Sequence, residues 1–69
     1  MKTINDVAAI LSNRRKELNL EQSDMYMRIG MKQQQYQRVE AGNDVRLSTF
    51  LRILEGLDLE MELRPIGKE

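Results

Sequence analysis

The 69-residue chain contains neither cysteine nor histidine. Without cysteine it has no disulfide framework and no thiolate chemistry, which suits a reducing cytosol. The lack of histidine excludes histidine metal sites, Ser-His-Asp triads and histidine general bases. No apolar run approaches the roughly 20 residues that cross a bilayer, and the amino terminus lacks a signal-peptide core. We therefore expect a soluble cytoplasmic protein, associated with the nucleoid, with no membrane contact, no metal, no cofactor and no catalytic residues.

The charges balance over the whole chain but are distributed unevenly along it. A net charge of zero and a pI near 6.3 count against a nucleic-acid binder, which is usually basic. From Arg28 to Arg52, however, five basic residues stand against two acidic ones, whereas from Ile53 to Glu69 two basic residues stand against five acidic ones. The middle of the chain is therefore locally positive, and we expect modest non-specific affinity for nucleic acid.

Hydrophobic spacing predicts four short helices joined by tight turns, over residues 4–18, 21–29, 33–40 and 47–56. Thr3, followed three residues later by Asp6, resembles a capping box at the start of the first helix. The side chains expected to face a common core are apolar at helical spacing: Ile4, Val7, Ala8, Leu11, Leu18, Met25, Ile29, Tyr36, Val39, Leu47, Phe50, Leu51 and Leu54. A chain of this length buries only about 60% of its unfolded surface, so the core is small.

Gly30 stands between the second and third predicted helices, where a tight corner needs the positive φ that glycine adopts at little cost. In residues 33–40 the apolar side chains point one way, and the outward face carries Gln34, Gln37 and Arg38, with Gln33 at its rim. An amide with a donor and an acceptor, or a forked guanidinium, is what reading a base edge in the DNA major groove requires. Residues 20–42 therefore predict a helix-turn-helix whose second helix enters the groove, although a glutamine run is also typical of a solvated helix face.

After the fourth helix the hydrophobic period changes to that of a strand. Apolar side chains at Leu59, Met61 and Leu63 alternate with charged ones until the single proline. A lone strand leaves backbone groups unpaired and one apolar face uncovered. The same strand from a second copy, antiparallel across a twofold axis, would satisfy these groups, as would a strand from a different protein. We divide the chain into a DNA-binding domain, residues 1–57, and a dimerisation strand with its tail, residues 58–69.

Residues 7–57 resemble the lambda-repressor-like, Xre/Cro-type helix-turn-helix domains. The match rests on the pattern L20-x-Q22-x-x-M25-x-x-x-I29-G30-M31-x-Q33-x-x-Y36-x-x-V39-E40-x-G42. The tail, L47-STFLRILEGLDLEMELRP, further resembles the HipB-like antitoxins, in which a small DNA-binding dimer binds a HipA-like serine/threonine kinase toxin and represses its own operon. The implied fold class is all-α: a four-helix domain with a short carboxy-terminal β-strand that pairs across a dimer.

The resemblance also implies roles for individual residues. It gives Gln22 a phosphate contact and Arg46 a backbone contact after the third helix. The base readers that it implies are Gln33, Gln34 and Arg38. Gln37 and Lys32 would lie beside them. Arg15 and Glu40 match positions that form a partly buried ion pair. Tyr26 departs from the pattern, because such domains usually carry alanine at this close approach of two helices, and its ring should widen the crossing or turn outward.

The implied function is sequence-specific transcriptional repression, as the autoregulating antitoxin of a HipA-like toxin–antitoxin pair. The partners would be double-stranded DNA with a palindromic operator, a second copy of the chain and a HipA-like kinase toxin. The residues leave three alternatives. The chain could be a free-standing Xre-family repressor without a toxin, or a protein-interaction module with a vestigial helix-turn-helix. An enzyme is the third, but only a Lys/Asp/Glu site would serve it, without a pocket to desolvate that site.

Overall fold

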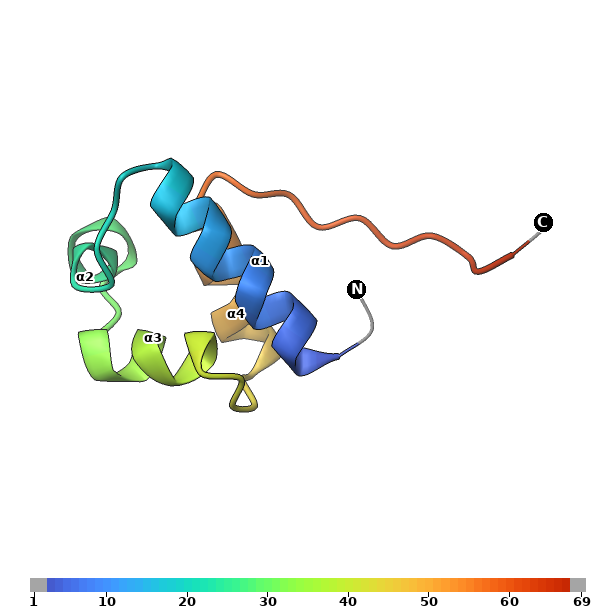
Figure 1. Cartoon of the computed structure of the whole chain (residues 1–69), viewed down its shortest axis with the longest axis horizontal. Helices are drawn as coiled ribbons and strands as arrows, with labels where there is room; N and C mark the ends of the chain where they lie inside the picture. Colours follow the sequence, from blue (N-terminus) through green and yellow to red (C-terminus); the bar gives the residue numbers. More distant parts are fainter. Residues whose placement is uncertain (1–2, 68–69) are drawn as a thin grey trace.

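The computed structural model describes residues 3–67, and this part of the chain folds into four α-helices (Figure 1). In chain order they are α1 (Ile4–Glu17), α2 (Asp24–Ile29), α3 (Gln33–Glu40) and α4 (Leu47–Gly56). α1 packs against α3, and α2 packs against both α3 and α4. The predicted all-α class is confirmed. The bounds of α3 and α4 are as predicted, α1 ends one residue early, and α2 begins three residues late.

The starts of α1 and α2 differ in how their free backbone donors are satisfied. At α1 the predicted capping box is present: the Thr3 hydroxyl accepts from the Asp6 backbone N–H at 3.1 Å, and the Asp6 carboxylate accepts from the Thr3 N–H at 3.2 Å. Residues 21–23 instead form a tight turn before α2. There the Asp24 carboxylate accepts from the Glu21 backbone N–H at 2.6 Å. This turn explains why α2 is shorter than predicted.

Three of the helices end in the same backbone motif. After α1, α3 and α4 one residue has a positive φ, namely Asn19 at 59°, Gly42 at 89° and Asp58 at 54°. In each case the N–H of the next residue bonds to the carbonyl five positions earlier, which is the pattern of a Schellman cap. After α1 and α4 that next residue is a leucine, Leu20 or Leu59, which packs against the core. The caps therefore end the three helices, and those after α1 and α4 also return the chain to the core.

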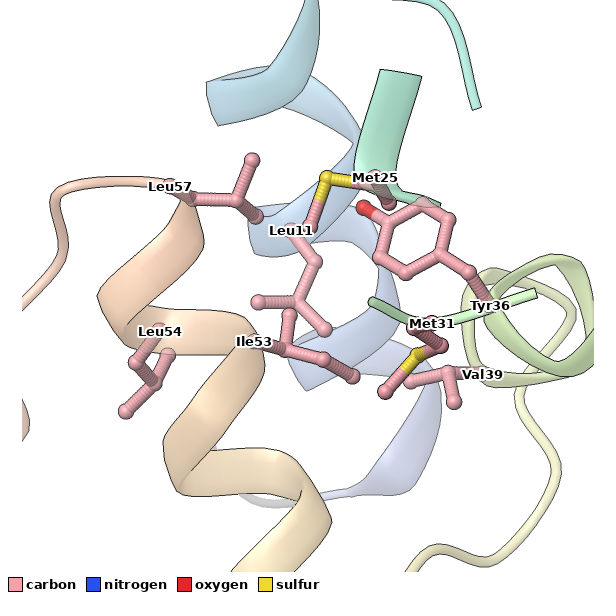
Figure 2. Packing of buried hydrophobic residues seen from close by; sticks show 8 residues of the cluster. All are labelled: Leu11, Met25, Met31, Tyr36, Val39, Ile53, Leu54 and Leu57. Carbon is pink, nitrogen blue, oxygen red and sulfur yellow. The ribbon is translucent and has the colours of Figure 1, made fainter. Parts of the chain in front are cut away.

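A single hydrophobic cluster lies between the helices (Figure 2). Its buried members are Leu11, Met25, Met31, Tyr36, Val39, Ile53, Leu54 and Leu57. The predicted core is wrong at three positions, because Ile4, Leu47 and Leu51 are exposed, Leu47 at 64%. It also omitted Ile53, which is completely buried. α4 is thus rotated about its axis relative to the prediction, and turns Ile53 and Leu57 toward the core.

The segment after α4 runs away from the helical body (Figure 1). Leu59 packs against the core, whereas Met61 and Leu63 are exposed. Between residues 58 and 67 no strand forms within the single chain, and a strand needs a neighbour to pair with. The strand that pairs across a dimer therefore stays a prediction, and residues 1–2 and 68–69 of the two predicted segments lie outside the described residues. None of the helices in the described range is long and apolar enough to span a bilayer.

Candidate nucleic-acid interface

The corner between α2 and α3 is formed by Gly30, as predicted. This residue has φ 71° and ψ 20°, in the left-handed region, and its N–H donates to the Tyr26 carbonyl at 2.8 Å. A Cβ built on Gly30 would meet no atom within 4 Å, so the backbone conformation, and not crowding, favours glycine here. The chain then passes through Lys32, an extended residue without a side-chain cap, into α3. The corner fixes the direction in which α3 leaves α2.

α3 is anchored by one face and exposed on the other. Tyr36 and Val39 are buried in the core. The long polar side chains of the helix are all exposed: Gln33, Gln34, Gln35, Gln37 and Arg38. Lys32, one residue before the helix, is exposed as well. The structure therefore places the predicted base readers Gln33, Gln34 and Arg38, and their neighbour Gln37, on the accessible side of a helix whose orientation is set by the core.

Arg38 and Arg46 come together at the far end of α3. A hollow of about 370 Å³ lies between the end of α3 and the start of α4, and both guanidinium side chains line it. Arg46 is the N-cap residue of α4, and no side chain caps that helix. One carboxylate, Asp44, also lines the hollow and accepts from the Val45 backbone N–H at 3.0 Å. Two cations against one anion, beside the uncapped start of a helix, give this end of the surface a positive potential.

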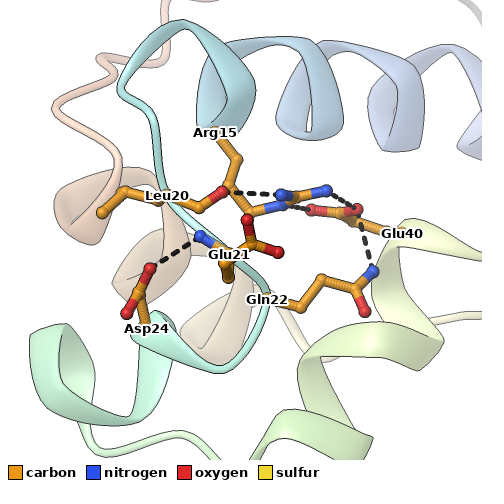
Figure 3. A network of polar contacts seen from close by, with 6 residues as sticks. All are labelled: Arg15, Leu20, Glu21, Gln22, Asp24 and Glu40. Carbon is orange, nitrogen blue, oxygen red and sulfur yellow. Dashed lines mark hydrogen bonds and ion pairs between the residues drawn. The ribbon is translucent and has the colours of Figure 1, made fainter.

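Gln22 lies in the turn before α2 and is held by a polar network (Figure 3). Glu40, the last residue of α3, accepts from Nε of Arg15 at 2.7 Å and from its Nη2 at 3.1 Å. Arg15 also donates from Nη1 to the Leu20 carbonyl at 2.7 Å. Gln22 donates from Nε2 to Oε1 of Glu40 at 3.1 Å. Because an ionised carboxylate only accepts, the Gln22 amide nitrogen must face it, and its second N–H is left for another acceptor.

The predicted ion pair between Arg15 and Glu40 is confirmed and is more deeply buried than expected. The two side chains are only 10% and 6% exposed. Burial alone would raise the pKa of the Glu40 carboxyl, but hydrogen bonds to it, led by those from Arg15, outweigh burial and lower the pKa. The hydrogen bond to Glu40 in turn raises the pKa of Arg15. Both groups are therefore charged at neutral pH, and the pair ties α1 to the end of α3.

Helical periodicity did not determine the orientation of Tyr26 or the role of Gln35. Tyr26 is 59% exposed, so its ring has taken the outward alternative. Gln35 was not predicted as a contact residue, yet it is exposed and lines hollows on α3 together with Arg38. Its position in the glutamine run was the available signal. Gln35 extends the candidate surface beyond the predicted set.

Comparison with known families accounts for this geometry. A helix-turn-helix family model matches residues 11–63. The chain belongs to this helix-turn-helix family. Because the domains of this Xre/Cro-like family bind DNA, the protein is a DNA-binding regulator. A comparison with functionally curated proteins finds no match.

Solved structures of HipB are similar over nearly the whole chain. The chains matched in the HipA–HipB–O2–O3 complex and in the HipB–O4 20mer complex each have a TM-score of 0.88 and 26% identity, with 97% of this chain and 96% of that chain covered. A structure described as an MDT protein gives the same values. The predicted resemblance to Xre/Cro-type domains and to HipB is thus confirmed.

Proposed function

We propose that this helix-turn-helix protein is a sequence-specific transcriptional repressor, which acts in the cytoplasm by binding a palindromic operator as a homodimer. The observation that carries the proposal is the exposed polar face of α3, whose opposite face is fixed in the core by Tyr36 and Val39. A rigid helix of this kind fits the major groove. Its amides match adenine and its guanidinium matches guanine, and the residues concerned are Gln33, Gln34, Gln37 and Arg38.

The phosphate contacts in this proposal flank the reading helix. On one side of the helix, the Gln22 amide has one N–H available for a phosphate, because its other N–H donates to Glu40. Lys32 lies at the start of α3, and Arg46 lies beyond its end. Contacts of this type set the register of a protein on the duplex without reading its sequence. The network around Glu40 supports the proposal because it orients the Gln22 amide before DNA arrives.

The apolar side chains of the tail and of the groove beside it support the homodimer. Leu59, Met61 and Leu63 of the tail are the proposed interface residues within the dimerisation segment 58–69. Next to the tail, a groove of about 270 Å³ lies between α1 and α4. Its apolar lining consists of Val7, Ile10, Leu11, Phe50, Leu54, Leu59 and Met61. A second copy that contributes the same strand and the same groove would cover both, as closed twofold symmetry requires.

The similarity to HipB over nearly the full chain supports a narrower role. We propose that the protein is the autoregulating antitoxin of a HipA-like kinase toxin. In the absence of such a toxin, the same surface would serve a free-standing repressor. Co-expression with any kinase-like protein that is encoded beside it, followed by size-exclusion chromatography, separates the two roles, since only an antitoxin co-elutes with the kinase.

The test of DNA reading is selection of duplexes from a random pool by the purified full chain. We expect a palindrome to be enriched. Gln34→Ala should then lower affinity by about 1–3 kcal/mol and relax the base preference at one position. Arg46→Ala should instead weaken binding to all sequences alike and reduce the slope of log affinity against log salt concentration by about one. Asn13→Ala, an exposed amide on α1, is the matched control and should change neither. If no sequence is enriched, the repressor proposal is wrong and an interaction module with a vestigial helix-turn-helix is favoured.

A further inference from the structure

Two arginines from other helices hold the point at which the chain leaves α4. Arg28 of α2 donates from Nε to the Gly56 carbonyl at 2.5 Å, and its Nη2 lies 3.6 Å from the Asp58 carboxylate. Arg14 of α1 donates from Nε to the Leu57 carbonyl at 3.0 Å. The last carbonyls of a helix have no partner within it, and a positive charge is favourable there. The root of the tail is therefore attached to the rest of the domain by side chains as well as by the chain.

α2 and α4 hold each other's ends. Arg52 of α4 donates to the carbonyl of Ile29, the last residue of α2, just as Arg28 donates to the last residue of α4. The helices also approach closely, because a Cβ built on Gly56 would lie only 2.7 Å from Cγ2 of Ile29. They are thus docked in one orientation, and α2 continues through the Gly30 corner into α3.

The tail leaves this junction in a defined direction. Asp58 has a φ of 54°, and the Leu59 N–H bonds back to the Leu54 carbonyl at 2.8 Å. Asp58 thus combines the backbone turn that directs the tail with the ion pair to Arg28. Figure 1 shows the tail leaving the body at this point and running away from α2. The direction of the tail is therefore linked to α2 through one arginine.

We propose that Arg28 is a positioning residue that sets which half-site spacing the dimer accepts. The inference rests on the proposed function, a dimer joined through its tails that reads two half-sites. One added base pair rotates a half-site by about 34° and moves it by about 3.4 Å. A tail held against both α1 and α2 cannot follow that change. A tail without its contact to α2 keeps the Arg14 bond to the Leu57 carbonyl but has more freedom to change direction after Asp58.

The test measures affinity for a single half-site and for paired half-sites at the preferred spacing and at spacings one and two base pairs away. Joining two half-sites raises affinity by about 10²–10⁴-fold when the geometry fits. We expect the wild type to lose about tenfold or more of that gain at the wrong spacings. Arg28→Met should lose less than about threefold while binding the single half-site as the wild type does. Lys16→Met, which removes an exposed cation without an ion pair among residues 3–67, should keep the wild-type ratio.

The ratio of the affinity at the preferred spacing to the affinity at the other spacings separates positioning from general stability. If Arg28 only stabilised the fold, Arg28→Met would weaken every duplex alike, and the unchanged ratio would overturn the inference. Should that variant not fold, Asp58→Asn decides, since it removes only the ion pair from an exposed side chain and asparagine also tolerates a positive φ. It should lower the ratio, and an unchanged ratio would overturn the inference. A wild type without any spacing preference would instead contradict the proposed function.

Discussion

Replacing Glu40 with glutamine tests the buried ion pair that links α1, α3 and the turn before α2. The substitution keeps the size of the side chain and removes its charge. Arg15 now donates to both carboxylate oxygens, at 2.7 and 3.1 Å. In the variant one of these oxygens becomes an amide nitrogen, so a donor faces a donor. The Gln22 amide also loses a charged acceptor, because its Nε2 bonds to the same group at 3.1 Å.

The cost follows from the burial of the pair. With side chains only 10% and 6% exposed, the guanidinium that is left behind is poorly hydrated. Removing one partner of a buried ion pair costs about 3–5 kcal/mol. A domain of this size has a total stability of only about 3–10 kcal/mol. At about 4–8 °C for each kcal/mol, we expect Tm to fall by at least about 12 °C.

Thermal unfolding followed by far-UV circular dichroism measures the effect. Glu17→Gln is the matched control, since its carboxylate pairs with Arg14 on the exposed surface and such pairs contribute at most about 1 kcal/mol. The double variant Arg15→Met/Glu40→Leu should be more stable than Glu40→Gln, because it leaves no unpaired charge. A Glu40→Gln protein within about 1 kcal/mol of the wild type, or a double variant whose cost equals the sum of its two single substitutions, would refute this reasoning.

Three further predictions follow from individual contacts. Folding lowers the pKa of Glu40. The contribution of its carboxylate to stability is therefore complete above the unfolded pKa of about 4.3 and is lost as the pH falls through the folded pKa. On acidification, the unfolding free energy of Glu40→Gln should accordingly decrease less than that of the wild type. Gly56→Ala should lower the unfolding free energy in urea by about 1–3 kcal/mol, because the added Cβ would lie 2.7 Å from Ile29 Cγ2; a stabilised variant would contradict this close approach. Tyr36→Phe should change stability by no more than about 1 kcal/mol, because the buried hydroxyl makes no hydrogen bond of good geometry among the described residues, although it lies close to the Glu40 carboxylate. A loss above about 1 kcal/mol in the same urea assay would show that the hydroxyl is bonded.

Local sequence rules were sufficient where a backbone feature needs one residue type. The capping box at Thr3 and Asp6 and the left-handed corner at Gly30 were both predicted, because each satisfies a requirement of its own turn. The start of α2 was placed too early, since Glu21 and Asp24 both suit a first helical turn. Sequence spacing does not reveal that the Asp24 carboxylate accepts from the Glu21 N–H before the helix begins.

Contacts between distant parts of the chain were beyond such rules. Arg14, Arg28 and Arg52 bond to carbonyls that lie 43, 28 and 23 positions away, and no periodicity marks them apart from ordinary surface cations. The pair of Arg15 and Glu40, 25 positions apart, was expected only through the family resemblance. Helical spacing was enough to predict that Gln33, Gln34, Gln37 and Arg38 of α3 are exposed, because that depends on one helix and one core.

The misjudged face of α4 follows from the same limit and bears on the dimer. Leu47 and Leu51 are four residues apart, as are Ile53 and Leu57, so two apolar stripes on one helix fit the helical period equally well. The core of a single chain takes only one of them, and Ile53 and Leu57 occupy it. Isolated exposed leucines need no explanation, but Leu47 lines a hollow with Phe50, and Phe50 also lines the groove beside the tail. A small domain with a marginal core gains stability from burying such a surface against a second copy. Leu47, which the one-chain prediction assigned to the core, therefore belongs in the proposed dimer to the surface that adjoins the groove beside the tail.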